Sequence, residues 1–295
     1  MFYQNIEDVI PEPEIVCVSP HYDDFLFFLG SYVLGMKGRG LLDTKRFTNI
    51  SCMSRTNYQE RDLEGNKDRS LKRLQYATGI RFIEDLECLD DLLGPRNFIY
   101  RVMGEDESQV RGKAFNESEG EMEMAFGSYE TMDESDWDIL RRLEACILEL
   151  AGRDDTAIVL PLSMKGHIDH FIVREAGVRA MIAAESKAAE SEAAESEAAE
   201  SKAAEPKAAF YFAEDKPYAG IMTDDESRVN DDFIAEHALV DRAFAGYPKE
   251  ILRLAYLHYP SQVDTIYDEG VIARNEQLKQ IYDTYADTDR IYKWR

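Results

Sequence analysis

The chain has 295 residues, of which 44% are hydrophobic and 11% aromatic, as expected for a packed protein rather than a disordered one. Its formal net charge is −24, and the acidic residues are spread along the whole sequence. Such a charge repels nucleic acids and anionic membranes, and no run approaches the roughly 18 consecutive apolar residues of a membrane helix. We therefore expect neither nucleic acid binding nor membrane insertion.

The N-terminus and the cysteines indicate a cytoplasmic protein. The first residues, MFYQNIEDVIPEPE, carry acidic groups where a secretory signal needs positive charge followed by an apolar segment. The four cysteines are far apart and form no CxxC motif, which predicts reduced thiols rather than a zinc ribbon or a redox pair.

Short apolar segments alternate with helical patterns in the first part of the chain. The segment 14–19 (EIVCVS) is rich in β-formers and apolar in its middle, which is typical of a strand buried on both faces. The expected elements that follow are a helix over about 25–36, a strand at 48–53, a helix at 62–78, a strand at 81–89 and a long loop at 94–133.

Regular patterns resume after this loop. We expect a helix at 134–150, a strand at 156–162, a helix from about residue 169, a strand at 208–213, and helices at 231–244, 247–258 and 271–285. Strands that alternate with helices imply right-handed crossovers. The sequence therefore predicts an α/β protein with a Rossmann-like, mostly parallel sheet and helices on both faces, forming a single domain over 1–295.

A low-complexity segment at about 183–207 interrupts this domain. It repeats AAESK, AAESE, AAESE, AAESK and AAEPK, and its alanine, glutamate and lysine are good helix formers. A five-residue unit advances about 140° around a helix, so no apolar seam accumulates. We interpret the segment as a solvated helical extension of the preceding helix that ends at Pro206.

Two motifs carry the chemistry. Pro20–Asp24 (PHYDD) follows the strand at 14–19, and His167–His170 (HIDH) follows the strand at 156–162. Both therefore lie past the carboxyl ends of parallel strands, where open α/β sheets bind ligands. A catalytic zinc ion takes three ligands from histidine and carboxylate side chains, and His21, Asp24 and His170 provide such a set.

The neighbouring residues of these motifs suggest further roles. Asp23 is available to take a proton from water, and His167 is placed to meet charge that grows on a substrate oxygen. Two alternatives stay open: Asp23 and Asp24 could cap the following helix, and each histidine could be a hydrogen-bonded core residue. We interpret the remaining histidines, His237 and His258, as structural.

The paired motifs resemble those of the PIG-L/LmbE-type zinc-dependent N-acetylglucosaminyl deacetylases. Weaker similarity extends to 210–218 (FYFAEDKPY) and 258–262 (HYPSQ). The resemblance implies one zinc ion per chain on His21, Asp24 and His170, and hydrolysis of an N-acetyl group on an amino sugar or glycoconjugate. Asp23 would be the general base and His167 the oxyanion-stabilising residue.

The resemblance also implies roles for less conspicuous residues. Asp169 would orient a histidine ligand, Arg69 would correspond to the substrate-binding arginine, and Asp90 or Asp91 to an acid that contacts the sugar. The sequence departs from the family pattern at three positions that are not metal ligands, namely Tyr22, Phe25 and Ile168. Loss of the glutamate usual at position 25 is expected to reshape the sugar pocket.

Two other functions compete with this interpretation. A nucleotide-binding oxidoreductase would share the fold, but the first strand leads into PHYDD rather than into a glycine-rich turn, and no GxGxxG motif is present. A non-catalytic carbohydrate-binding or scaffold protein could retain the fold. The complete set of candidate metal and catalytic residues favours the enzyme, and metal analysis separates the two.

Overall fold

The computed structural model describes residues 1–62, 64–95, 97–113, 127–195 and 207–295, with only the backbone of 187–195. Within these residues it has a seven-stranded sheet of order β3-β2-β1-β4-β5-β7-β6. The strands are β1 (Glu14–Ser19), β2 (Arg46–Ser51), β3 (Phe98–Val102), β4 (Thr156–Pro161), β5 (Ala209–Ala213), β6 (Val240–Ala245) and β7 (Thr288–Lys293). The helices are α1 (Asp24–Gly38), α2 (Leu71–Leu93), α3 (Glu134–Ala151), α4 (Ile168–Glu195), α5 (Asp224–Glu236), α6 (Pro248–His258) and α7 (Thr265–Ile281).

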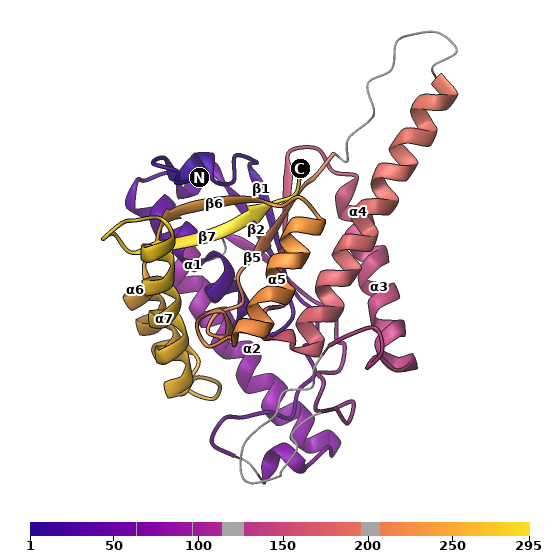
Figure 1. Ribbon diagram of the computed structural model, residues 1–295. Coiled ribbons are helices and arrows are strands. Elements are labelled where there is room, and N and C mark those ends of the chain that lie inside the picture. The colour runs from indigo at the N-terminus through magenta and orange to yellow at the C-terminus, as the bar shows by residue number, and fades with distance from the viewer. Residues whose placement is uncertain (63, 96, 114–126, 196–206) are drawn as a thin grey trace.

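The sheet is mostly parallel, and its two faces are covered by different helices. Strands β1 to β5 run parallel, whereas β7 pairs antiparallel with both β5 and β6. Because side chains alternate along a strand, Ile15 and Cys17 belong to the core that also holds residues of α1, α2, α6 and α7, while Val16 and Val18 belong to the core that holds residues of α3, α4 and α5 (Figure 1). The predicted Rossmann-like α/β class is confirmed.

Most of the predicted elements are confirmed to within two residues. They are the strands predicted at 14–19, 48–53, 156–162 and 208–213 and the helices predicted at 25–36, 134–150 and 247–258. The glycine-containing stretch at 35–40 ends α1, with Gly40 in the left-handed region at φ 68°, so it is a helix stop and no phosphate-binding turn.

The helix predicted at 62–78 and the strand predicted at 81–89 are wrong. A single helix, α2, runs from Leu71 to Leu93, and the third strand is β3, inside the region predicted as a loop at 94–133. Gly79 lies inside the helix and does not end it, because a glycine within a helix costs only about 1 kcal/mol. An added Cβ at Gly79 would meet no other atom within 4 Å. Residues 114–126 of the predicted loop lie outside the described residues.

The C-terminal region also differs from the prediction. The helix predicted at 231–244 is wrong at both ends: α5 starts at a capping box of Thr223 and Glu226 and stops at Glu236, before Ala238 at φ 50°. The residues that follow form β6. The helix predicted at 271–285 begins earlier, after the cap Asp264, and the unpredicted β7 follows it.

The low-complexity repeat continues α4 without a break. The helix extends to Glu195, and Figure 1 shows this end projecting away from the layers of the fold. The predicted helical extension is therefore confirmed up to Glu195. The rest of the repeat, including the predicted end at Pro206, lies outside the described residues.

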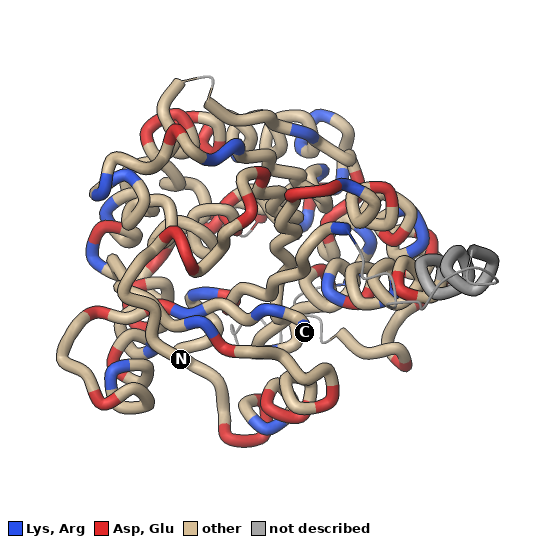
Figure 2. The backbone as a smooth tube through the Cα atoms, turned by 90° about the horizontal axis from the view of Figure 1, so that it is seen from above, with Lys and Arg blue, Asp and Glu red and all other residues tan. Residues whose placement is uncertain are grey.

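Charge is distributed around the molecule rather than gathered on one face. Figure 2 shows acidic segments on every side of the tube, with basic residues between them. Among the helices in the described ranges, none combines the length and the apolar character needed to cross a bilayer. The distribution in Figure 2 agrees with a charge that is spread over the exposed surface.

A buried ion cluster joins the C-terminal helix and strand to the parallel part of the sheet. Glu214, directly after β5, accepts hydrogen bonds from Arg274 of α7 at 2.6 and 2.8 Å and from Arg290 of β7 at 2.6 and 2.8 Å. Burial alone would raise the pKa of the Glu214 carboxyl, but the two guanidinium groups hold it well below its ordinary value.

We expect Glu214→Gln to lower the free energy of unfolding by about 3–5 kcal/mol at neutral pH, because two buried arginines lose their counter-charge. Since the folded-state pKa lies below the unfolded value of about 4.3, this stabilisation is present above that pH and is lost as the pH falls below it. Urea denaturation at several pH values should show that the free energy of unfolding of the wild type approaches that of the variant in acid.

The matched control is Glu250→Gln, which removes an exposed pair with Arg253 and should cost less than about 1 kcal/mol. Equal losses in the two variants, or a difference that does not shrink in acid, would contradict the role given to Glu214.

Candidate metal centre

The two histidine motifs meet at the carboxyl edge of the sheet. The PHYDD residues connect β1 to α1, and the HIDH residues connect β4 to α4 through a short 3-10 turn at Met164–Gly166. Ser163 and Lys165 adopt left-handed backbone conformations in that connection, with φ of 60° and 59°. Because β1 and β4 are parallel neighbours, both connections emerge at the same edge.

His21, Asp24 and His170 face one another at distances that suit a metal ion. His21 Nδ1 lies 3.2 Å from His170 Nε2. Of the Asp24 carboxylate oxygens, Oδ2 lies 3.7 Å from His21 Nδ1 and Oδ1 lies 3.6 Å from His170 Nε2. Ligand atoms on a tetrahedral zinc ion with bonds of roughly 2.0–2.2 Å are about 3.3–3.6 Å apart. The three side chains therefore fit a zinc ion.

Carboxylates on the far side of each ring orient the two histidines. His21 Nε2 lies 3.0 Å from Asp169 Oδ2, and His170 Nδ1 contacts Asp215 Oδ1. Since a carboxylate only accepts, these nitrogens carry ring protons, and in the neutral form of each ring the nitrogens that face each other present lone pairs. This pairing of histidines with carboxylates is frequent around metal ions, and it directs the two facing nitrogens toward one positive charge, which a proton or a metal ion can supply.

The same contacts shift the pKa of both rings. Burial alone would lower the pKa of His21 and His170. The hydrogen bond to Asp169 and nearby carboxylates outweigh burial and raise the pKa of His21, and Asp24 and Asp215 raise that of His170 to about 9. The local potential is therefore strongly negative, as a cation site requires.

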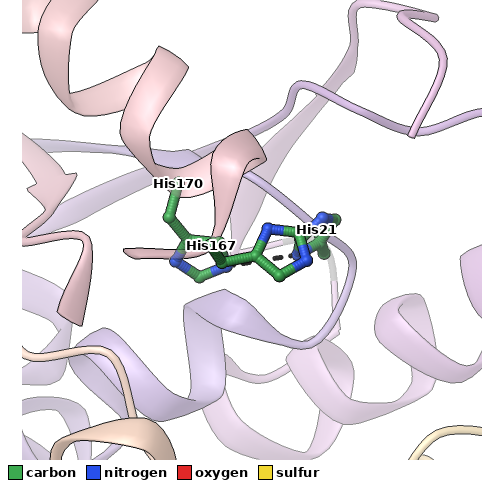
Figure 3. A group of neighbouring side chains, drawn as sticks. All are labelled: His21, His167 and His170. Carbon is green, nitrogen blue, oxygen red and sulfur yellow. Dashed lines mark hydrogen bonds between the residues drawn. The ribbon is translucent and has the colours of Figure 1, made fainter. Parts of the chain in front are cut away.

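His167 belongs to the same cluster but has a different protonation pattern. Figure 3 shows its ring beside those of His21 and His170, and one ring nitrogen of each lies within 4.8 Å of the others. His167 Nδ1 accepts the backbone N–H of Asp169 at 3.2 Å, which leaves the ring proton on Nε2. Burial lowers the pKa of His167 well below its ordinary value, so the ring is neutral. Its Nε2–H suits a hydrogen-bond donor better than a further ligand.

Asp23 faces the cavity beside this cluster. It occupies the N-cap position of α1 without a side-chain cap bond, and the Asp24 carboxylate accepts the backbone N–H of His21 at 2.6 Å instead of a helical one. Capping is therefore not what holds the two carboxylates. Asp23 accepts a hydrogen bond from Tyr267 at 3.1 Å and lies 3.8 Å from the Arg81 guanidinium.

Asp169 is fully buried and makes three contacts. Besides His21, it accepts from the backbone N–H of Ser108 at 2.9 Å and from Arg111 Nη2 at 2.8 Å. Burial alone would raise the pKa of Asp169, but Arg111 and His21 hold it well below its ordinary value. The structure places Asp169 against a histidine as the resemblance implies. Ser108 and Arg111 belong to the segment predicted as a loop, where no local pattern marks them.

A cavity of about 100 Å³ opens beside the metal centre. Besides the five motif residues His21, Asp23, Asp24, His167 and His170, it is lined by Tyr58, Arg81, Glu107, Gln109, Lys216, Pro217, Tyr218, Gln262 and Tyr267. The segments 210–218 and 258–262, singled out in the sequence, thus reach the site. Asp215 was missed, although its place after a strand at the same edge is a signal that could have found it.

Arg69 and Asp91 do not line this cavity. Arg69 is exposed ahead of α2, and Asp91 is exposed on α2, where it lies 3.0 Å from His258 Nε2. The expected third strand is the end of a helix, so Asp90 and Asp91 do not follow a strand. Arg81 is the arginine that lines the cavity.

The three departures from the family pattern are buried away from the cavity. Phe25 and Ile168 belong to the two hydrophobic cores, and Tyr22 donates its hydroxyl to the backbone oxygen of Ser54 at 2.8 Å. None of the three is among the lining residues. They therefore leave the metal centre intact.

Solved deacetylase structures share this fold. The zinc-inhibited form of teicoplanin deacetylase Orf2 superposes with a TM-score of 0.59 at 15% identity over 95% of this chain and 97% of that one. A deacetylase–teicoplanin complex superposes with a TM-score of 0.59 at 14% sequence identity, over 95% of this chain and 97% of that one. The A40926 pseudoaglycone deacetylase Dbv21 superposes with a TM-score of 0.52 at 14% sequence identity, over 96% of this chain and 97% of that one. No protein-family model and no curated protein sequence matches the chain. At these identities the likeness establishes the fold.

We expect the purified protein to hold one divalent ion per chain, most favourably zinc, and His170→Ala to lose most of it because one of three ligands is removed. His258→Asn, which removes a histidine that pairs with Asp91 outside the cavity, is the control and should keep the metal. Elemental analysis after dialysis against zinc measures both. A wild type that stays free of metal in zinc-supplemented buffer would refute the site.

Proposed function

We propose that the chain is a zinc-dependent hydrolase of the PIG-L/LmbE type that removes an N-acetyl or similar N-acyl group from an amino sugar or glycoconjugate. The observation that carries this proposal is the ligand set of His21, Asp24 and His170 with Asp23 and His167 on the same cavity. The fold shared with deacetylase structures supports it.

Asp23 is the proposed general base. Hydrolysis adds the oxygen of water to the acyl carbon and breaks the bond from that carbon to nitrogen. Zinc in such a site supplies Lewis acidity toward the acyl carbonyl and lowers the pKa of water to about 7. Asp23 accepts the proton that the water loses and returns it to the nitrogen, which leaves as an amine. Tyr267 and Arg81 hold the Asp23 carboxylate in place for both transfers.

His167 is the proposed donor to the substrate oxygen. Its Nε2–H is free to donate because Nδ1 is occupied by the backbone N–H of Asp169. Negative charge develops on the carbonyl oxygen during attack, and a preorganised donor stabilises it where water is scarce. Asp169 and Asp215 contribute by holding His21 and His170 in the tautomers that direct their lone pairs together.

Two neighbouring aspartates are expected to respond differently to the same substitution. Asp23→Asn should keep the metal and lower kcat by about 10²–10⁴-fold, because the base is lost. Asp24→Asn should weaken metal binding, because a neutral amide is a poor zinc ligand. His167→Ala should keep the metal and slow turnover. Metal content and acetate release from a panel of N-acetylated amino sugars are measured on the same preparations.

The reverse pattern, with metal lost from Asp23→Asn and kept by Asp24→Asn, would exchange the two assignments. Normal turnover by Asp23→Asn would place the base elsewhere. Bound metal in the wild type without release of acetate from any member of the panel would favour the non-catalytic alternative.

A further inference from the structure

The cations that line the cavity are already paired with carboxylates. Arg81 Nη1 lies 3.0 Å from Glu107 Oε1, and its Nη2 lies 3.8 Å from Asp23 Oδ1. Lys216 Nζ contacts both oxygens of Asp289, at 2.6 and 2.7 Å. Arg81 and Lys216 are the only lysine or arginine residues among the described lining residues. An anionic group on a substrate would therefore find no unpaired cation there.

When a divalent ion is bound, the charged residues that line the cavity would also leave no surplus of positive charge. The ion and Arg81 together balance Asp23, Asp24 and Glu107, and Lys216 balances Asp289. A phosphate or carboxylate placed in this cavity would add a negative charge without a partner of opposite charge. The net charge of −24 on the whole chain opposes the approach of such a substrate as well.

Glu107 is the residue that sets this balance. The residue is 5% exposed, its Oε1 accepts a hydrogen bond from Arg81 Nη1, and its Oε2 accepts one from the hydroxyl of Thr56. If Glu107 lost its charge, the remaining counter-ion of Arg81 in the cavity would be Asp23, at 3.8 Å. The Arg81 guanidinium would then be available to an anion in the cavity. The charge of Glu107 thus controls whether Arg81 can bind an anion.

We propose that the site selects uncharged or cationic N-acyl amino sugars and excludes those with phosphate, sulfate or carboxylate on the amino-sugar ring, and that Glu107 determines this specificity by occupying Arg81. This inference rests on the proposed deacetylase function and adds the class of its substrate.

A matched pair of sugars tests the proposal: N-acetylglucosamine and N-acetylglucosamine 6-phosphate, with the zinc-loaded full chain. We expect kcat/KM for the phosphate to be lower by roughly tenfold or more, because like charges in an interface disfavour binding strongly. Added salt should narrow the difference, since it screens the long-range part of the repulsion.

Glu107→Gln keeps the size of the side chain and one acceptor oxygen for Arg81, but it removes the charge and replaces the other acceptor with an NH2 donor. We expect the ratio of the two kcat/KM values to shift toward the phosphate by about tenfold. Glu105→Gln is the control, because Glu105 lies in the same segment but pairs with Arg142 at 2.6 Å, outside the cavity. It should leave the ratio unchanged.

Calorimetric binding of the same two sugars separates this proposal from the catalytic one. Preferred binding of N-acetylglucosamine without hydrolysis would refute the deacetylase function and support the substrate class. Equal or better binding or turnover of the phosphate by the wild type, or no binding of the neutral sugar, overturns the substrate class. Thermal melting checks that Glu107→Gln folds, and the wild-type comparison decides the matter if it does not.

Discussion

The buried carboxylate of Asp169 is the constraint on which the site depends. A charge with no exposure to water is tolerated only when its oxygens are bonded and its charge is compensated. Its partners are His21 after β1, the backbone of Ser108 and the guanidinium of Arg111 beyond β3. Satisfying this one group therefore brings two distant parts of the chain, the β1–α1 connection and the segment beyond β3, to the start of α4. The facing histidine nitrogens and the position of Glu107 in the cavity follow from that convergence.

The proposed metal ligands could be located from the sequence because their signals are local. Buried parallel strands are continuous apolar runs, and each histidine motif follows one directly, so topology alone brings them to one edge. The residues that hold the ligands could not be predicted in the same way. Arg111 and Glu107 act through contacts with residues far away in sequence, and with 58 acidic residues in 295, no single carboxylate stands out. Asp215 is an intermediate case, because its place shortly after β5, at the same edge of the sheet, is a weak indication that it belongs to the site.

The largest error of the sequence-based prediction lies at α2, and its physical cause also explains why Arg69 and Asp91 were wrongly expected at the site. In the middle of this helix the inward face carries the buried polar residues Arg81, Glu84 and Asp85, whereas the buried residues of its last turns are apolar. A helix with a polar inner face lacks the apolar periodicity by which helices are recognised. Interpreting its second half as a strand moved the expected sugar contacts to Arg69 and Asp91, whereas Arg81 lines the cavity.

The side of the cavity formed by Arg81 and Gln262, here called its outer wall, is held by polar contacts rather than by packing in the hydrophobic cores. Glu84 bonds Ser261 at 2.6 Å and Gln262 at 3.0 Å, and Arg81 bonds Gln262 at 2.6 Å. The metal ligands, by contrast, stand on elements packed in those cores. Mutations in the wall can therefore accumulate during evolution while the metal scaffold persists, because they leave the packing of β1, α1 and α4 untouched. If the proposed function holds, such a division would allow descendants of one gene to diverge in the sugars they recognise while they retain the same reaction.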